Sequence, residues 1–230
     1  MSIAENFQQI RERIAQAARE AGRNPEDVQL VAVSKTKPAQ LIAEAFRCGQ
    51  LIFGENYVQE LVVKSAELPG EIRWHFIGHL QSNKVRQIAG LVQMIHSVDR
   101  LSLAREIDRQ WGALGKSCDI LVQVNISREA TKSGASSEEL FGLVREIARL
   151  PQLRIKGLMT MPPFFDDPEA ARPYFKALTA LARQVEAAQI PGVEMRELSM
   201  GMSGDFEAAI AEGATLVRVG SALFGERRYL

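Results

Sequence analysis

Eight short apolar runs, separated by segments that mostly carry helical periodicity, are the feature that most constrains how this chain can fold. The first run covers residues 28–35, is rich in β-branched side chains and is too short for a helix of ordinary length. The other seven cover residues 51–53, 74–77, 94–98, 120–126, 155–161, 195–200 and 216–219. Apolar strands that alternate with helices are typical of a parallel sheet buried on both faces. We therefore expect an α/β fold.

The number of strands favours a closed sheet. Eight β/α units predict a (β/α)8 barrel, the TIM barrel, and its usual length of about 250 residues is close to the 230 residues of this chain. An open doubly wound sheet has the same local pattern and remains the alternative. The sequence contains no internal repeat, low-complexity tract or linker rich in Pro, Gly or Ser. Residues 1–230 are therefore expected to form a single domain.

An extra helix is expected before the first strand. Apolar residues recur there at steps of three and four, at Ile3, Phe7, Ile10, Ile14 and Ala17. This spacing is the stripe of an amphipathic helix, and Gly22 is placed to end it. Two later helices have start signals, a possible capping box of Ser136 with Glu139 and the pair Asp167-Pro168.

The charge balance argues against polyanionic partners. The 28 Lys and Arg residues equal the 28 Asp and Glu residues, so the formal net charge is zero. A chain without net positive charge has no global field to attract a nucleic acid or an anionic membrane. We expect neither as a partner.

The two cysteines and the N-terminus suggest a cytoplasmic protein. Cys48 and Cys118 lie far apart with no CxxC pair, so neither a disulfide framework nor a thiolate zinc site is indicated. The first 16 residues include charges at positions 5, 11, 12 and 13, which a signal peptide would not carry within its apolar region. No window of 18 residues is apolar and uncharged.

Lys35 is a candidate reactive amine. Functional side chains in a barrel collect at the carboxyl ends of the strands, and Lys35 ends the first run. It shares the parity of Val31 and Val33, so an inward orientation of those residues brings its amine to the mouth over an apolar floor that lowers its pKa. Such a lysine is a candidate nucleophile for an aldehyde. The alternative is a solvent-exposed lysine at a strand end.

The last third of the chain suggests an anion site. Gly201 and Gly204, with Ser199 and Ser203, make a small turn that leads into a helix. Gly220-Ser221 directly follows the last strand. Phosphate groups in this fold are usually held by the loops after strands seven and eight and by a helix N-terminus. Two ordinary glycine turns are the alternative.

Arg218 should project beside these loops, where it could pair with a carboxylate or face a pyridine nitrogen. In the second case the guanidinium keeps that nitrogen unprotonated and weakens the ring as an electron sink. His75 and His79 lie four residues apart, but on a strand this spacing does not bring two ligands together, so we expect no metal.

Seven ordered segments together resemble the pyridoxal 5′-phosphate (PLP) homeostasis protein family. They are VAVSKTKP, FGENYVQE, WHFIGHLQSNK, VNISREATKSG, GLMTMPP, LSMGMSGDFEAAI and VRVGSALFG. The resemblance extends from the first strand to Gly225 and implies a barrel of the alanine racemase N-terminal type.

The resemblance also implies roles for particular residues. It implies that PLP is held as a Schiff base on Lys35, that Arg218 faces the pyridine nitrogen and that Asn56 lies near the ring. It implies phosphate contacts at Ser199, Gly220 and Ser221, and it matches Lys132 to a lysine proposed to help transfer the cofactor.

Members of this family are regarded as regulators of vitamin B6 pools and of amino- and keto-acid balance, without established turnover. The resemblance therefore implies a carrier or buffer of PLP, with apo PLP-dependent enzymes as possible recipients. Related racemases have a second domain that supplies an acid/base, and a chain that ends at Leu230 leaves no room for it, so we expect no catalytic residues and a monomer. An amino acid racemase or a Schiff-base aldolase of low activity remains the alternative.

Overall fold

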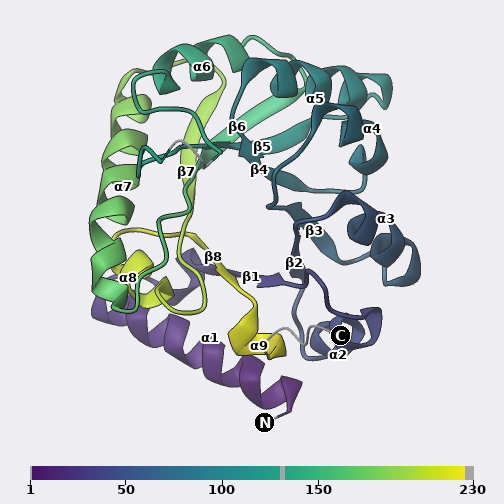
Figure 1. Ribbon diagram of the computed structural model, residues 1–230, viewed down its shortest axis with the longest axis vertical. Helices are drawn as coiled ribbons and strands as arrows, with labels where there is room; N and C mark the ends of the chain where they lie inside the picture. The colour runs from purple at the N-terminus through teal and green to yellow at the C-terminus, as the bar shows by residue number, and fades with distance from the viewer. Residues whose placement is uncertain (1, 130–132, 226–230) are drawn as a thin grey trace.

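The computed structural model describes residues 2–129 and 133–225, in which eight parallel strands close into a barrel in sequence order (Figure 1). The strands are β1 (Gln29–Val33), β2 (Ile52–Glu55), β3 (Arg73–Phe76), β4 (Met94–Val98), β5 (Cys118–Gln123), β6 (Leu153–Met159), β7 (Val193–Ser199) and β8 (Leu216–Val219). Each of the eight predicted runs contains or overlaps one of them. The predicted fold is confirmed, because β1 also pairs with β8, placing Val31 opposite Arg218.

Helices surround the barrel. The α-helices are α1 (Ile3–Glu20), α2 (Ala39–Arg47), α3 (Val58–Glu67), α4 (Val85–Ile88), α5 (Leu101–Ala113), α6 (Leu140–Ile147), α7 (Arg172–Ala187), α8 (Phe206–Ala211) and α9 (Ser221–Phe224). Short 3-10 turns are η1 (Pro25–Asp27), η2 (Ser82–Lys84) and η3 (Pro168–Ala171). The last of these forms where Asp167-Pro168 predicted a helix start, and α7 follows it directly.

The apolar side chains divide into two clusters. The larger cluster fills the space between the outer face of the strands and the helices. The smaller one fills the barrel interior and consists of Val31, Ile52, Met94, Leu121, Met159 and Leu216. Alternation along each strand produces this division, since successive side chains point to opposite faces. The interior cluster is the apolar floor beneath the carboxyl ends of the strands.

The predicted extra helix is α1. It begins with a capping box in which Ser2 and Glu5 exchange side-chain and backbone hydrogen bonds. Its buried residues are Phe7, Ile10, Ile14, Ala17 and Ala18, the stripe seen in the sequence. Figure 1 shows α1 along the outside of the barrel beside α8 and α9, against which it packs.

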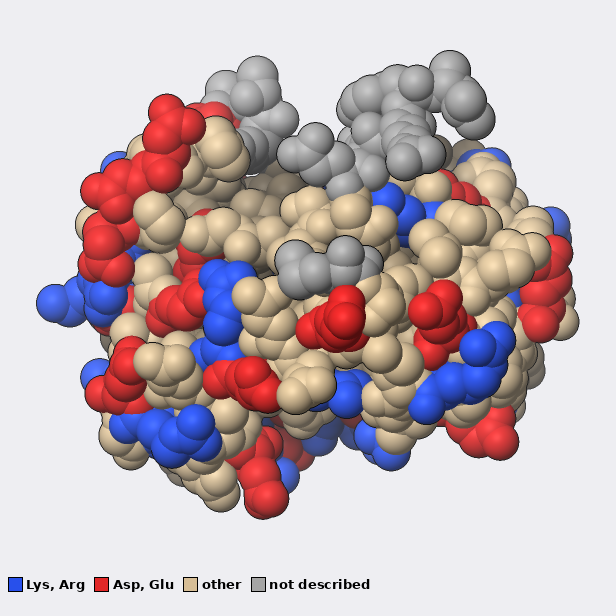
Figure 2. All heavy atoms as spheres, turned by 90° about the horizontal axis from the view of Figure 1, so that it is seen from below, with Lys and Arg blue, Asp and Glu red and all other residues tan. Residues whose placement is uncertain are grey.

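The surface carries mixed charge. Figure 2 shows Lys and Arg side chains interspersed with Asp and Glu side chains on one face of the molecule. Within the described ranges, none of the helices is long and apolar enough to cross a membrane.

Candidate functional site

A cavity of about 700 Å³ opens at the carboxyl ends of the strands. Its walls come from the ends of β1, β2, β3 and β8 and from the loops after β6 and β7. The lining residues used below are Lys35, Lys37, Asn56, Met161, Phe164, Phe165, Ser203, Gly204, Asp205, Arg218, Gly220 and Ser221. The cavity therefore lies where a barrel places its functional groups.

Lys35 lies two residues beyond the end of β1 and lines the cavity, half-buried. It continues the inward parity of Val31, which belongs to the interior cluster. The neighbouring Lys37 donates from Nζ to the carbonyl oxygens of Phe224 and Gly225, at 3.0 and 2.8 Å. These bonds tie the loop after β1 to the end of α9.

Asn56 follows β2 directly and lines the same cavity. Its Oδ1 atom is buried and has no hydrogen-bond partner among the described residues. The chain after β3 passes close by, because a Cβ at Gly78 would collide with the Asn56 carbonyl oxygen. A buried acceptor without a partner is uncommon in native proteins and suits a site that a polar ligand completes.

Arg218 is on β8, and only 3% of it is exposed. Its Nη1 donates to Ser199 Oγ at 2.6 Å, and its Nη2 donates to the Thr160 carbonyl oxygen at 2.9 Å. Burial lowers the pKa of the guanidinium to about 10, and the nearby carboxylate of Asp205 acts in the opposite direction. Arg218 therefore remains a cation at neutral pH, held in direction by two acceptors.

Ser199 lies below the cavity instead of lining it. The residue is fully buried, and its Oγ is also 2.9 Å from His96 Nδ1. The Nε2 atom of His96 lies in turn 2.9 Å from His75 Nδ1. Burial lowers the pKa of His75 to about 4 and the pKa of His96 well below its ordinary value, so both rings are neutral. A continuous polar chain thus runs from Arg218 down the barrel interior.

The loops after β7 and β8 meet at one wall of the cavity. Gly220 and Ser221 line it, as do Ser203 and Gly204. The Oγ of Ser203 accepts a hydrogen bond from the Gly220 N–H at 3.2 Å. The sequence pointed to Ser199, Ser203 and Gly204 in the loop after β7, and of these Ser203 and Gly204 line the cavity, whereas Ser199 does not. Ser199 is the last residue of β7, and the residues that follow it in the loop reach the cavity.

Other residues of interest fall outside this arrangement. Lys132 lies outside the described residues. His79 is exposed, and its Nδ1 is 3.2 Å from Ser133 Oγ, whereas His75 pairs with His96 inside the barrel. Among the described residues, no group of three or more His, Cys, Asp or Glu side chains could hold a metal ion.

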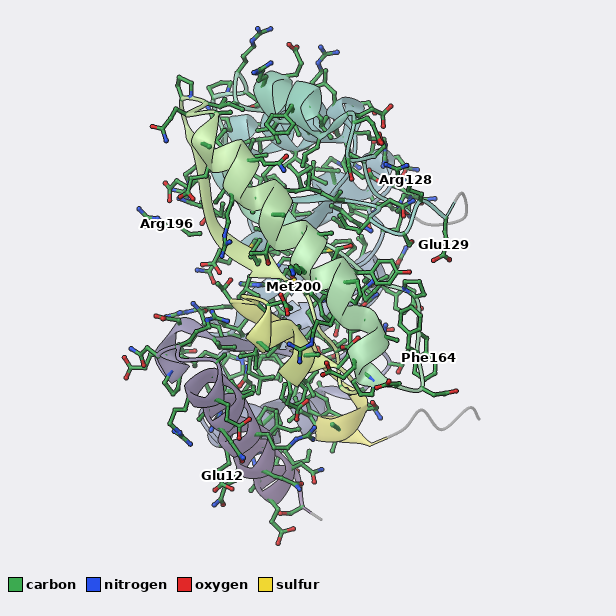
Figure 3. The ribbon with its side chains drawn as sticks, turned by 90° about the vertical axis from the view of Figure 1, so that its left-hand side faces the viewer. Glu12, Arg128, Glu129, Phe164, Arg196 and Met200 are labelled. Atoms are coloured by element: carbon green, nitrogen blue, oxygen red, sulfur yellow. The ribbon has the colours of Figure 1, made fainter. Side chains whose placement is uncertain are left out.

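An apolar rim was missed by reasoning from the sequence. Met161, Phe164 and Phe165 follow β6 and line the cavity. Phe164 is 84% exposed, and Figure 3 shows it projecting at the same edge of the molecule as Arg128 and Glu129. Phe165 packs instead on Tyr174, with ring centroids 5.7 Å apart. The sequence signal for this rim was the pair of adjacent aromatic residues that follows Pro162-Pro163.

The chemistry of the lining suits a ligand of a definite kind. A primary amine, a buried guanidinium and an amide oxygen without a partner in the described residues line the cavity, and the Gly- and Ser-containing turns after β7 and β8 close one side. An aromatic aldehyde with an acceptor atom in its ring and an anionic group would use all of these features. PLP is such a molecule, and the residues present fit it.

Comparison with known proteins agrees with this geometry. Residues 5–228 match the model of the alanine racemase N-terminal domain, so the chain is a barrel of that class. Within the class it belongs to the pyridoxal phosphate homeostasis protein family. It is 48% identical to the pyridoxal phosphate homeostasis protein of Pseudomonas aeruginosa over 99% of this chain and 97% of that one. It is 43% identical to the protein of that name from Aquifex aeolicus over the full length of both.

A solved structure places a ligand in this family. The structure of PipY from Synechococcus elongatus PCC7942 with PLP bound superimposes with a TM-score of 0.85 and 38% sequence identity. The alignment covers 97% of this chain and 100% of PipY. The family resemblance read from the seven motifs is confirmed.

Proposed function

We propose that this protein binds PLP in the cavity at the carboxyl end of the barrel and carries or buffers it in vitamin B6 and amino/keto-acid homeostasis. The observation that carries the proposal is that Lys35, Asn56 and Arg218 line one cavity together with the loops after β7 and β8. Family membership and the PLP bound to PipY support it. PLP supplies an aldehyde that condenses with a primary amine with loss of water. Lys35 is the amine proposed to hold it as a Schiff base.

Asn56 and Arg218 would position the ring. Asn56 offers amide donors, and its Oδ1 has no partner among the described residues, in the cavity that Lys35 also lines. Arg218 donates hydrogen bonds only, and its charge opposes a proton on a facing pyridine nitrogen. A ring held this way is a weak electron sink. This arrangement favours storage of PLP over turnover of amino acids, so we propose that the protein is not an enzyme.

The anionic group would be held by Gly220 and Ser221, with Ser203 and Gly204 facing them. The Gly220 N–H donates to Ser203 Oγ in this structure. A phosphate oxygen accepts hydrogen bonds from backbone donors of this kind. The family pattern places Ser199 at the phosphate, and in the structure its Oγ accepts a hydrogen bond from Arg218 Nη1. Ser199 would therefore also act on PLP through the guanidinium.

Further aspects of the proposal concern the whole molecule. We propose that residues 1–230 form a single PLP-binding domain that acts as a monomer and delivers PLP to apo-enzymes, with Lys132 assisting transfer. Free thiols at Cys48 and Cys118 are consistent with a reducing, cytoplasmic compartment.

The absorption spectrum of the purified protein with added PLP, before and after borohydride, tests the proposal. The wild type should show a band that borohydride fixes, and Lys35→Ala should lack it. Lys176→Ala, which changes an exposed lysine of α7, is the matched control and should behave as the wild type. A wild type that binds no PLP would contradict the proposal. Incorporation of solvent deuterium into amino acids would instead favour the racemase alternative.

A further inference from the structure

The loop that carries Lys35 adopts a backbone conformation that its sequence does not favour. Lys37 N–H donates to the Ser34 carbonyl oxygen at 3.1 Å, so Lys35 and Thr36 are the two central residues of a turn. Thr36 has a φ of 62°, a left-handed conformation that usually requires Gly at this position of a turn. A β-branched residue there is an outlier that persists only when its surroundings hold it.

A cluster of charged side chains from β2 and α3 holds this turn in its conformation. Glu60 accepts a hydrogen bond from the Thr36 N–H at 2.8 Å. Lys64 donates to the Ser34 carbonyl oxygen at 2.8 Å, and the Ser34 hydroxyl donates to Glu55 Oε1 at 2.7 Å. The backbone is therefore held on both sides of Lys35. We call Glu55, Glu60 and Lys64 the loop clamp.

The loop clamp is itself joined by two ion pairs. Lys64 Nζ lies 2.7 Å from Glu55 Oε1 and 2.6 Å from Glu60 Oε2. The side chain of Lys64 is 8% exposed, that of Glu55 is 0% exposed and that of Glu60 is 29% exposed. Glu55 points away from the cavity toward α3, because it has the opposite parity to Asn56. Burial raises the pKa of Glu55, and Lys64 partly counters this. Buried ion pairs contribute little net stability, which makes a positioning role the better account of this cluster.

We propose that Glu60 and Lys64 are positioning residues that fix the direction of Lys35 by holding its turn in the left-handed conformation at Thr36. This inference rests on the proposed function, since it assigns the clamp to covalent capture of PLP. In the described part of the chain, the clamp side chains bond to the Ser34 and Thr36 backbone, to the Ser34 hydroxyl and to one another, and none of the three residues lines the cavity. Its loss should affect covalent attachment at Lys35 and leave noncovalent binding in the cavity unchanged.

Glu60→Ala is the variant of choice. It removes the acceptor for the Thr36 N–H at a partly exposed position, whereas changing Lys64 would strand the fully buried Glu55 carboxylate. Glu60→Gln keeps an oxygen acceptor and should restore most of the wild-type behaviour. Glu67→Gln, an exposed residue of the same helix, is the matched control for the loss of one carboxylate from α3.

Two ligands distinguish a loss of positioning at Lys35 from damage to the cavity. PLP can attach to Lys35, whereas 4-deoxypyridoxine 5′-phosphate has a methyl group in place of the aldehyde and cannot. Glu60→Ala should weaken covalent PLP binding, measured by absorbance and by borohydride fixation, by about tenfold. Its affinity for the deoxy analogue should match the wild type. Adding Thr36→Gly should reduce the loss, because glycine adopts the left-handed turn without help.

The outcomes are distinct. Equal covalent binding of PLP by wild type and Glu60→Ala would overturn this inference, and so would an equal loss of both ligands. Either result would leave the proposed function intact, because the wild type would still fix PLP at Lys35. A wild type that binds the deoxy analogue but fixes no PLP with borohydride would overturn the proposed function and this inference with it.

Discussion

Ser199 Oγ accepts a 2.6 Å hydrogen bond from Arg218 Nη1 inside the barrel. The two residues come from the adjacent strands β7 and β8, and both are buried. A guanidinium in an apolar interior needs acceptors to remain charged and to keep one direction. Ser199 thus determines how Arg218 presents its remaining donors to the cavity above.

Replacing Ser199 with Ala should lower the free energy of unfolding by about 1–3 kcal/mol, because a buried cation loses an acceptor. Urea denaturation of the two proteins measures this difference. Ser102→Ala, at an exposed position of α5, is the control and should change stability by less than about 0.5 kcal/mol. Identical unfolding midpoints for wild type and Ser199→Ala would contradict the role assigned to this contact.

Stability should fall as the pH drops below 6.5, because His75 and His96 are buried as neutral rings. The unfolded chain takes up a proton at each histidine near pH 6.5, whereas the folded protein does not, since burial lowers the pKa of His75 to about 4 and that of His96 well below 6.5. Each histidine therefore contributes a loss of about 1.4 kcal/mol per pH unit below 6.5. For His75 the loss continues down to about pH 4.

Urea denaturation between pH 7 and pH 5 tests this dependence. His75→Gln should reduce the slope of unfolding free energy against pH, even where it lowers stability at every pH. His79→Gln, which removes an exposed histidine, is the control for the loss of one imidazole. A slope that His75→Gln does not alter would show that the buried pair does not govern it.

Gly201→Ala should destabilise the protein by about 2 kcal/mol or more. Gly201 has a φ of 86°, and a Cβ there would lie 2.6 Å from Ala209 Cβ and 2.9 Å from Phe206 Cα. Gly204 belongs to the same loop, but a Cβ at that position would have no neighbour within 4 Å. Gly204→Ala is therefore the matched control. Thermal unfolding measures the stability of both variants, and an equal loss of stability in the two would contradict the prediction.

Ser221→Asp should weaken PLP binding by at least about tenfold, because like charges placed together cost several kcal/mol. The carboxylate would lie in the turn proposed to hold the phosphate. Pyridoxal, which lacks the phosphate, should bind the variant and the wild type alike in equilibrium titrations. Ser102→Asp controls for the added charge. If the variant lost pyridoxal binding as well, the damage would not be specific to the phosphate.

The barrel and its reactive lysine were predictable because they depend on local patterns. Short β-branched runs identify the strands, and the alternation along the first run brings Lys35 to the mouth. The same alternation turns Glu55, the last residue of β2, outward to Lys64. The sequence alone could not show that α3 would supply a cation for it.

The position of each residue along the barrel axis could not be predicted from the sequence. The chain of contacts through His96, Ser199 and Arg218 joins β4, β7 and β8. Which residues share a layer depends on how the strands are staggered around the barrel, and no single strand's sequence encodes that stagger. The position of Ser199 below the cavity follows from the stagger. Phe164 was not predicted because the strand-end pattern of a barrel points to polar side chains.

The pairing of β1 with β8 has a consequence for biosynthesis. Val31 lies opposite Arg218, so the first and last strands complete the barrel by meeting each other. Lys35 leaves the ribosome well before Arg218, and the two residues cannot line one cavity until β1 and β8 have paired. Capture of PLP would therefore require a closed barrel, and nascent chains that still lack β8 would not sequester it.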